Sequence, residues 1–199
     1  MYKDVHQFLS TCESYQMHSV VRHRYELHLT YPPAIHFKWM VDLVTMLMGA
    51  GQMRYLVPAR EDLTNQVEGR TLTNKTTAFV CKFLIEDVIC RYGCVGKIVV
   101  DRGELDAKDV EELFDRLGMK LSLTTTYNPE ANGKIERGHG PIVKSIVRAC
   151  EGRVGNWPRL LPYALWADRT THSSVIGYIP AELMFGQKPI MQVERTITS

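Results

Sequence analysis

The sequence predicts an α/β domain built on a mixed, five-stranded sheet flanked by helices. The first half of the chain holds three strand-like apolar runs separated by turn residues, a pattern typical of antiparallel strands. An apolar strand, an amphipathic helix and a further strand follow. This order, at this length, indicates a parallel pair of strands with a right-handed crossover. Together the two parts make one mixed sheet.

The antiparallel part begins with a hairpin. Residues 40–46 and 53–57 are strand-like, and residues 49–52, Gly-Ala-Gly-Gln, supply the turn between them. A third strand is expected near residues 67–72. Because proline cannot donate a hydrogen bond to a sheet ladder, we expect the second strand to end early at Pro58 or to lie at a sheet edge there.

Residues 74–92 form the first predicted helix, which is expected to cover the sheet. Gly93 serves as its stop, and one apolar stripe carries Val80, Phe83, Leu84 and Val88. A short buried strand, residues 98–101, comes next.

The second helix begins near Asp106, a plausible N-cap, and Gly118 ends it. Its apolar positions follow the helical repeat and are Val110, Leu113, Phe114 and Leu117. Leu121 and Leu123 then alternate with polar residues in the last predicted strand.

A further helix is expected over residues 142–150, with Pro141 at its first position. Its apolar face carries Ile142, Ile146 and Ala149. Beyond it, several large side chains are interpreted as core and helix packing: Trp157, Leu160, Leu161, Tyr163 and Trp166. Asp168 and Arg169 are interpreted as structural partners.

Two carboxylates lie at the ends of strand-like runs. Asp42 interrupts the apolar run of residues 39–44, and Asp101 follows the aliphatic residues 98–100. An unpaired buried charge is costly, so a cation is expected beside each carboxylate. Mg²⁺ or Mn²⁺ takes such ligands, and two ions roughly 3.5 to 4 Å apart can activate an attacking oxygen and stabilise a leaving one.

A third carboxylate, Glu136, follows a loop rich in Pro, Asn and Gly. Taken alone, Asp42 is as well explained by hydrogen bonds to backbone amides, and Glu136 by solvation. The combination of Asp42, Asp101 and Glu136 predicts a two-metal phosphoryl-transfer site.

This triad, the segment from Thr124 to Arg137, and the later Asn156-Trp157-Pro158 and Leu161-Pro162-Tyr163-Ala164 resemble the integrase catalytic core of gypsy-type long-terminal-repeat retrotransposons and retroviruses. The resemblance runs from about residue 39 to about residue 189. It implies a ribonuclease-H-like fold with Asp42, Asp101 and Glu136 as catalytic metal ligands for two Mg²⁺ or Mn²⁺ ions. Between Asp101 and Glu136 lie 34 residues, one fewer than in the family's common form.

By this resemblance, the chain is expected to be a retrotransposon integrase catalytic domain that processes DNA 3′ ends and transfers strands, with element ends and target DNA as partners. It is expected to work as a homo-oligomer in the nucleus. One alternative is a catalytically idle nucleic-acid-binding remnant of a decayed polyprotein. Another is a cellular nuclease of the ribonuclease H type, against which the segment from Tyr127 to Arg137 argues.

Several residues near the triad are candidates for nucleic-acid binding. Lys134 and Arg137 flank Glu136, where a DNA backbone must pass. Lys144 and Arg148 follow on the next helix, where an ordinary solvated face explains them as well as phosphate contact does. Tyr127 and Asn128 either contact nucleic acid or anchor their loop.

Residues 1–30 are expected to be a truncated remnant of the family's zinc-binding module plus a linker, followed by the catalytic core at 31–190 and a tail at 191–199. In the segment that starts at Cys12, Tyr15 stands where the second cysteine of a Cys-x-x-Cys motif would be, and few residues precede it. We therefore do not expect zinc binding, which needs four ligands in so small a module.

Composition sets wide limits on function. A formal net charge of +2 neither supports nor excludes nucleic-acid binding. The five cysteines, an odd number without a secretory leader before them, are expected to be reduced thiols. No apolar stretch approaches the roughly 20 residues that a membrane-spanning helix needs. An intracellular protein without a membrane partner is expected.

Overall fold

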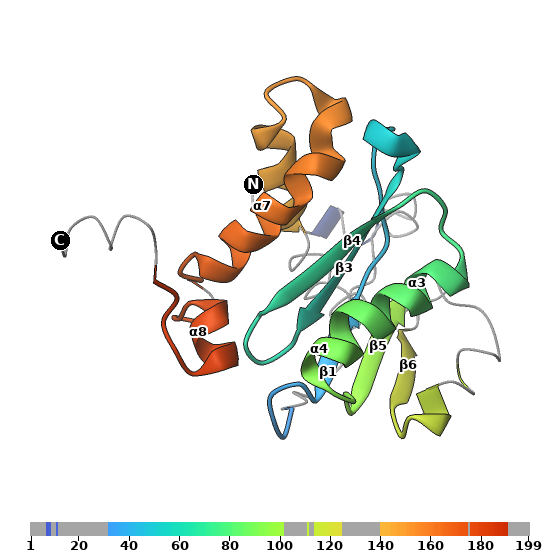
Figure 1. Ribbon diagram of the computed structural model, residues 1–199, viewed down its shortest axis with the longest axis vertical. Coiled ribbons are helices and arrows are strands. Elements are labelled where there is room, and N and C mark those ends of the chain that lie inside the picture. Colours follow the sequence, from blue (N-terminus) through green and yellow to red (C-terminus); the bar gives the residue numbers. More distant parts are fainter. Residues whose placement is uncertain are drawn as a thin grey trace. The chain divides into compact units, whose positions relative to one another are not determined.

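The structure is a computed structural model, and it describes residues 7–8, 11, 32–101, 111, 114–124, 140–174 and 176–190. The chain divides into two compact units, Met1–Thr30 and Tyr31–Ser199. In the first unit the described residues are helical, and Thr11 Oγ1 donates a hydrogen bond to the carbonyl oxygen of Gln7 at 3.0 Å. The second unit contains the sheet and the helices that cover it (Figure 1).

A mixed sheet forms the centre of the second unit. Its strands are β1 (Lys38–Val41), β2 (Val44–Thr45), β3 (Tyr55–Glu61), β4 (Val67–Leu72), β5 (Lys97–Asp101) and β6 (Lys120–Thr124). Strand β3 pairs antiparallel with β4 on one side and with β1 and β2 on the other. Strand β1 pairs parallel with β5, and β5 pairs parallel with β6. The predicted α/β class and mixed sheet are confirmed.

Strands β1 and β2 replace the single strand predicted over residues 40–46. Val41 pairs with Ala59, and Val44 pairs with Leu56, so the register against β3 is the same on both sides of the interruption. The two strands are therefore one line of residues broken at Asp42, and the sheet is effectively five strands wide. The predicted turn forms η1 (Ala50–Gln52), in which Gly51 has a φ of 70°.

The expectation that β3 ends at Pro58 or lies at an edge is wrong. Strand β3 runs through Pro58 and has neighbours on both sides. The Pro58 carbonyl accepts a hydrogen bond from the Asp42 amide at 3.1 Å, so this edge of Pro58 faces the gap between β1 and β2. The N–H that proline lacks would point to the same side, so no hydrogen bond between β3 and β4 is lost.

One face of the sheet is covered by a helical segment that comprises α3 (Thr77–Phe83), the π-helical η2 (Leu84–Ile89) and α4 (Cys90–Tyr92) (Figure 1). It begins three residues later than predicted and ends, as predicted, at Gly93, whose φ of 83° favours glycine. The predicted apolar stripe is buried and packs against Trp39, Val41 and Val57.

The helix between β5 and β6 is described at residues 111 and 114–116. Phe114 is buried as predicted, whereas Leu117 is 37% exposed. Leu117 lies in the turn that Gly118, with a φ of 69°, completes, and the next residue, Met119, takes the buried position. Val110 and Leu113 lie outside the described residues.

The opposite face is covered by helical residues 140–149, η3 (Val154–Asn156) and α7 (Trp157–Thr170), with α8 (Pro180–Phe185) packed against α7 (Figure 1). Trp157 Nε1 donates a hydrogen bond to the carbonyl oxygen of Leu47 at 2.7 Å, which ties α7 to the hairpin. The apolar cluster on this face contains Leu56, Val67, Ile142, Ile146, Cys150, Trp157 and Leu161. Within the described part of the chain, no helix is long and apolar enough to cross a bilayer.

Three packing predictions on this face are wrong. Ala149 is exposed, and Cys150, one residue later, is buried in its place. On α7, Tyr163 is 70% exposed and Trp166 is 56% exposed, because the helix turns Trp157, Leu161 and Ala164 toward the sheet.

Candidate active site

Asp42 follows β1 directly and lies in the middle of the sheet, between β3 and β5. The residue is partly buried, and its Oδ1 accepts a hydrogen bond from the Leu43 amide at 2.8 Å. A carboxylate offers about four acceptor positions on two oxygens, so this hydrogen bond alone does not prevent the group from binding a cation.

Asp101 is the last residue of β5, the parallel neighbour of β1. Val41 pairs with Val100, so the next positions along the two strands are Asp42 and Asp101. Because parallel strands end at the same edge of a sheet, their backbones bring both acidic residues to one edge. Asp101 also pairs with Thr124, so β6 ends beside this pair.

The remaining residues of the predicted site near Glu136 lie outside the described residues: Tyr127, Asn128, Lys134, Glu136 and Arg137. In the residues that are described, no group of three or more His, Cys, Asp or Glu side chains is placed to hold a metal ion. The adjacent Asp42 and Asp101 positions fit Mg²⁺ or Mn²⁺, because carboxylate oxygens are the ligands these hard cations prefer.

Lys144 and Arg148 lie on helical residues 140–149, and both are exposed. They are four residues apart and thus share one side of the helix, while Ile142 and Ile146 are buried on the other. The helix therefore presents two positive charges to solvent, an arrangement that suits a phosphate backbone and a solvated face alike.

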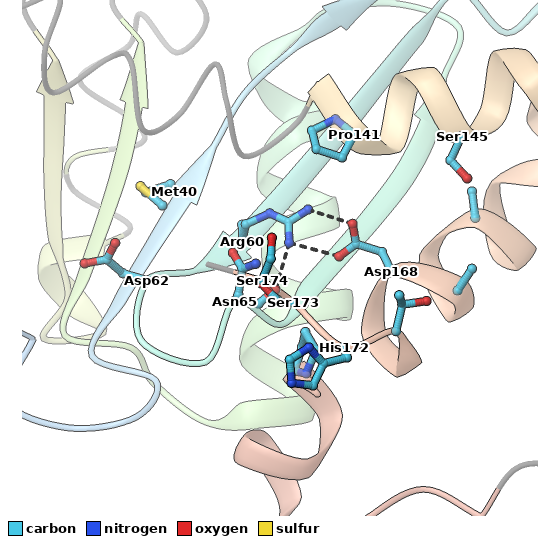
Figure 2. Close-up of a pocket in the computed structure, with 14 residues that line it drawn as sticks. Met40, Arg60, Asp62, Asn65, Pro141, Ser145, Asp168, His172, Ser173 and Ser174 are labelled. Carbon is cyan, nitrogen blue, oxygen red and sulfur yellow. Dashed lines mark hydrogen bonds and ion pairs between the residues drawn. The ribbon is translucent and has the colours of Figure 1, made fainter. Parts of the chain in front are cut away.

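A cavity of about 540 Å³ lies on the sheet face to which α7 packs, and Met40, two residues before Asp42, contributes to its wall (Figure 2). Its polar centre is Arg60, whose side chain is 3% exposed and forms a two-point ion pair with Asp168 at 2.9 and 3.2 Å. The same guanidinium donates to the carbonyl oxygen of Asn65 at 2.8 Å. These bonds tie β3 to α7.

Sequence reasoning missed Arg60 as a buried cation. The available signal was an arginine inside a strand with Leu56, Val57 and Ala59 before it, where an unpaired charge would be costly. The structural role predicted for Asp168 is confirmed by this pair.

A second buried network centres on Glu68 of β4. Its carboxylate is 4% exposed and accepts from Arg169 at 2.6 Å, from Arg91 at 3.1 Å and from the Tyr92 hydroxyl at 2.7 Å. Arg169 is thus a structural partner, as predicted. Burial, together with the hydrogen bond to Glu68, raises the pKa of Tyr92 to about 12.

No family model matches the chain. In sequence it is 31% identical over 152 residues to the Gag-Pol polyprotein of avian reticuloendotheliosis virus, a match that covers 76% of this chain and 13% of that polyprotein. The Gag-Pol polyprotein of gibbon ape leukemia virus is 28% identical over 153 residues, covering 76% and 9%. The chain therefore spans only a small part of the length of the curated relatives it matches.

Two solved structures share the fold. A chain of the simian T-cell lymphotropic virus intasome, in complex with PP2A regulatory subunit B56 gamma, matches with a TM-score of 0.73 and 15% identity over 96% of this chain and 70% of that chain. The catalytic core domain of BIV integrase matches with a TM-score of 0.61 and 22% identity over 82% of this chain and 99% of that chain. The mixed sheet with helices on both faces is thus the ribonuclease-H-like architecture of that core domain.

Proposed function

We propose that this chain, which is homologous to the catalytic core of retroviral integrases, is the catalytic core of a gypsy-type retrotransposon integrase that processes DNA 3′ ends and transfers them to target DNA. The observation that carries the proposal is the placement of Asp42 and Asp101 at neighbouring ends of β1 and β5 within this fold. The motifs from Thr124 to Arg137 support the assignment to the gypsy type.

The proposed metal ligands are Asp42, Asp101 and Glu136. Two Mg²⁺ or Mn²⁺ ions, when bound, supply activation of the attacking oxygen and stabilisation of the leaving oxygen. The chain's own contribution is to bring the Asp42 and Asp101 positions to one edge of the sheet. Hydrogen bonds from Asp42 to Pro58 and from Leu43 to Asp42 restrict the position of the first carboxylate.

The proposed partners are element ends, target DNA and further copies of the chain. Lys134, Arg137, Lys144 and Arg148 would contact phosphates, with Tyr127 and Asn128 beside them. The match to a chain of a viral intasome supports DNA binding and oligomerisation. The nucleus is the proposed location, because chromosomal DNA is the target.

The deciding experiment is a joining assay with the purified chain, a labelled DNA duplex that carries the element's end sequence, and Mg²⁺ or Mn²⁺. We expect shortened 3′ ends and products joined to target DNA, both lost in Asp101→Asn. If neither the chain nor a longer protein with flanking domains yields product, the enzymatic proposal fails. Salt-dependent DNA binding whose affinity is unchanged by metal and by Asp101→Asn would then identify a catalytically idle binding module.

A further inference from the structure

Three polar atoms are buried on the sheet face that Tyr92 of α4 covers, and each lacks a hydrogen-bond partner within the described part of the chain. They are Trp39 Nε1, Glu61 Oε1 and Gln66 Oε1. The three residues are at most 1% exposed. We propose that one internal water molecule accepts a hydrogen bond from the Trp39 indole and donates to Glu61 Oε1 and Gln66 Oε1. This water site does not depend on the proposed function.

The sheet places the three residues side by side. The Asp62 amide donates to the Lys38 carbonyl at 3.0 Å, so these two residues form a hydrogen-bonded pair. The adjacent pair, Trp39 and Glu61, is therefore a non-hydrogen-bonded one, whose Cα atoms are typically about 4.5 Å apart. On the other side of Glu61, its amide donates to the Gln66 carbonyl at 2.8 Å. Because directly opposite residues face the same side of a sheet, the three side chains form one row.

Tyr92 covers this row. The centroid of its ring is 5.1 Å from that of the Trp39 ring, and its hydroxyl oxygen accepts from Gln66 Nε2 at 3.3 Å. Glu61 stands between the two residues that Tyr92 contacts. The three unpartnered atoms therefore belong to one enclosed compartment between the strands and α4.

Other hydrogen bonds fix which atoms remain available in this compartment. Glu61 Oε2 accepts from the Thr64 amide at 2.6 Å and from the Thr64 hydroxyl at 2.7 Å, so Oε1 is the free oxygen. The Tyr92 hydroxyl donates its proton to Glu68 Oε1 at 2.7 Å, so its oxygen can only accept from the Gln66 side chain. This bond directs the Gln66 amino group toward Tyr92 and leaves Gln66 Oε1 as an acceptor.

One donor and two acceptors match the hydrogen-bonding capacity of a water molecule. Water can accept from the indole N–H and donate one O–H to each oxygen, and buried waters typically make about three such bonds to otherwise unsatisfied groups. A metal cation does not fit, because the indole N–H is a donor only. An anion does not fit, because both oxygens are acceptors. The water joins β1, β3 and β4 where β1 begins.

NMR on the unmodified full chain tests the site through its three tryptophans. We expect the Trp39 indole proton to show cross-peaks with water whose NOE and ROE have opposite signs, the signature of water that stays bound longer than the protein takes to tumble. Trp157, whose indole donates to the Leu47 carbonyl at 2.7 Å, should show none. Trp166, which is 56% exposed, should show only cross-peaks of equal sign.

Relaxation dispersion of the water ¹⁷O nucleus detects long-lived water without interference from exchanging hydroxyl protons. Gln66→Met removes one acceptor and keeps a side chain of similar size. We expect this variant to lose one long-lived water relative to the unmodified chain, and to lose the Trp39 cross-peaks with it. Gln187→Met, at an exposed position, is the matched control and should lose neither.

Absence of opposite-sign cross-peaks at Trp39 in the unmodified chain would overturn the inference, even if Gln66→Met fails to fold. Equal ¹⁷O dispersion in the unmodified chain and in a folded Gln66→Met variant would also overturn it. Loss of DNA joining or of Mg²⁺ binding would count against the proposed function alone, because neither measurement involves this compartment.

Discussion

At the scale of single residues, Asp42 combines a structural bond with a proposed chemical role. Its carboxylate accepts from the Leu43 amide, and its own amide donates to Pro58. The first contact restricts rotation of the side chain, and the second fixes the backbone that carries it. A side chain that is already held in place loses less conformational entropy when it binds a metal ion.

Replacing that ligand should abolish catalysis while leaving the fold intact. We expect Asp42→Asn to reduce metal-dependent DNA joining by about 100-fold or more, since the amide carries no charge to bind a divalent cation. Asp115→Asn, at an exposed position of a helix, is the matched control and should retain full activity. Equal losses in the two variants would assign the defect to something other than metal binding.

Tyr92 has no proposed role in catalysis, but its buried environment makes the stability of the fold depend on pH. Because its folded pKa is raised to about 12, the folded chain keeps the phenolic proton over a pH range in which the unfolded chain releases it. The resulting stability is present below about pH 10, the unfolded pKa, and is lost as pH rises toward 12.

Denaturant unfolding measured from about pH 10 to about pH 12 tests whether stability falls as pH rises. We expect the free energy of unfolding to fall between about pH 10 and pH 12, and Tyr92→Phe to flatten part of that fall. Tyr163→Phe, at an exposed tyrosine of α7, should leave the profile unchanged. An identical profile in Tyr92→Phe would contradict the role of Tyr92.

At the scale of elements, helical residues 140–149 divide their surface between the core and solvent. Ile142 and Ile146 pack with Leu56 of β3 and Trp157 of α7, whereas Lys144 and Arg148 are exposed. The apolar repeat predicted the helix and these two buried positions. It placed Ala149 inside, although the chain turns after 149 and buries Cys150.

Truncation of the buried face should be costly. We expect Ile146→Ala to lower the free energy of unfolding by about 2–5 kcal/mol, because Ile146 is fully buried and its loss leaves a cavity. Val147→Ala, whose side chain is 51% exposed, should change it by less than about 1 kcal/mol. Chemical denaturation of both variants makes the comparison.

The exposed face should contribute to DNA affinity. We expect Lys144→Ala and Arg148→Ala each to weaken binding to any DNA sequence and to reduce the slope of log affinity against log salt by about one. Lys82→Ala removes an exposed lysine from α3, on the opposite face of the sheet, and should leave the slope unchanged. Slopes equal to that of the unmodified chain would identify an ordinary solvated face.

At the scale of the whole molecule, the apolar runs of the sequence predicted strands and helices that the structure contains. Features that depend on residues far apart in the sequence could not be predicted from the local pattern of residues. The third predicted strand, residues 67–72, is β4, and the helical segment that ends with α4 stops at Gly93 as predicted. Arg60 could not be matched to Asp168, which is 108 residues away.

The same distinction applies to the candidate site. The aliphatic residues before Asp101 predicted a strand that ends there, and parallel pairing of β1 with β5 makes the Asp42 and Asp101 positions neighbours. Local pattern also failed for Tyr163 and Trp166, because an aromatic residue on an amphipathic helix is compatible with either face. Packing of α7 on the sheet decided the outcome.

The central claim is that Asp42, Asp101 and Glu136 hold two divalent ions. Calorimetric titration of the chain with Mg²⁺, repeated with Asp42→Asn, Asp101→Asn and Glu136→Gln, tests it most directly. We predict two bound ions in the unmodified chain and loss of at least one in each variant. Binding that is absent from the unmodified chain, or unaffected by all three substitutions, would contradict the claim.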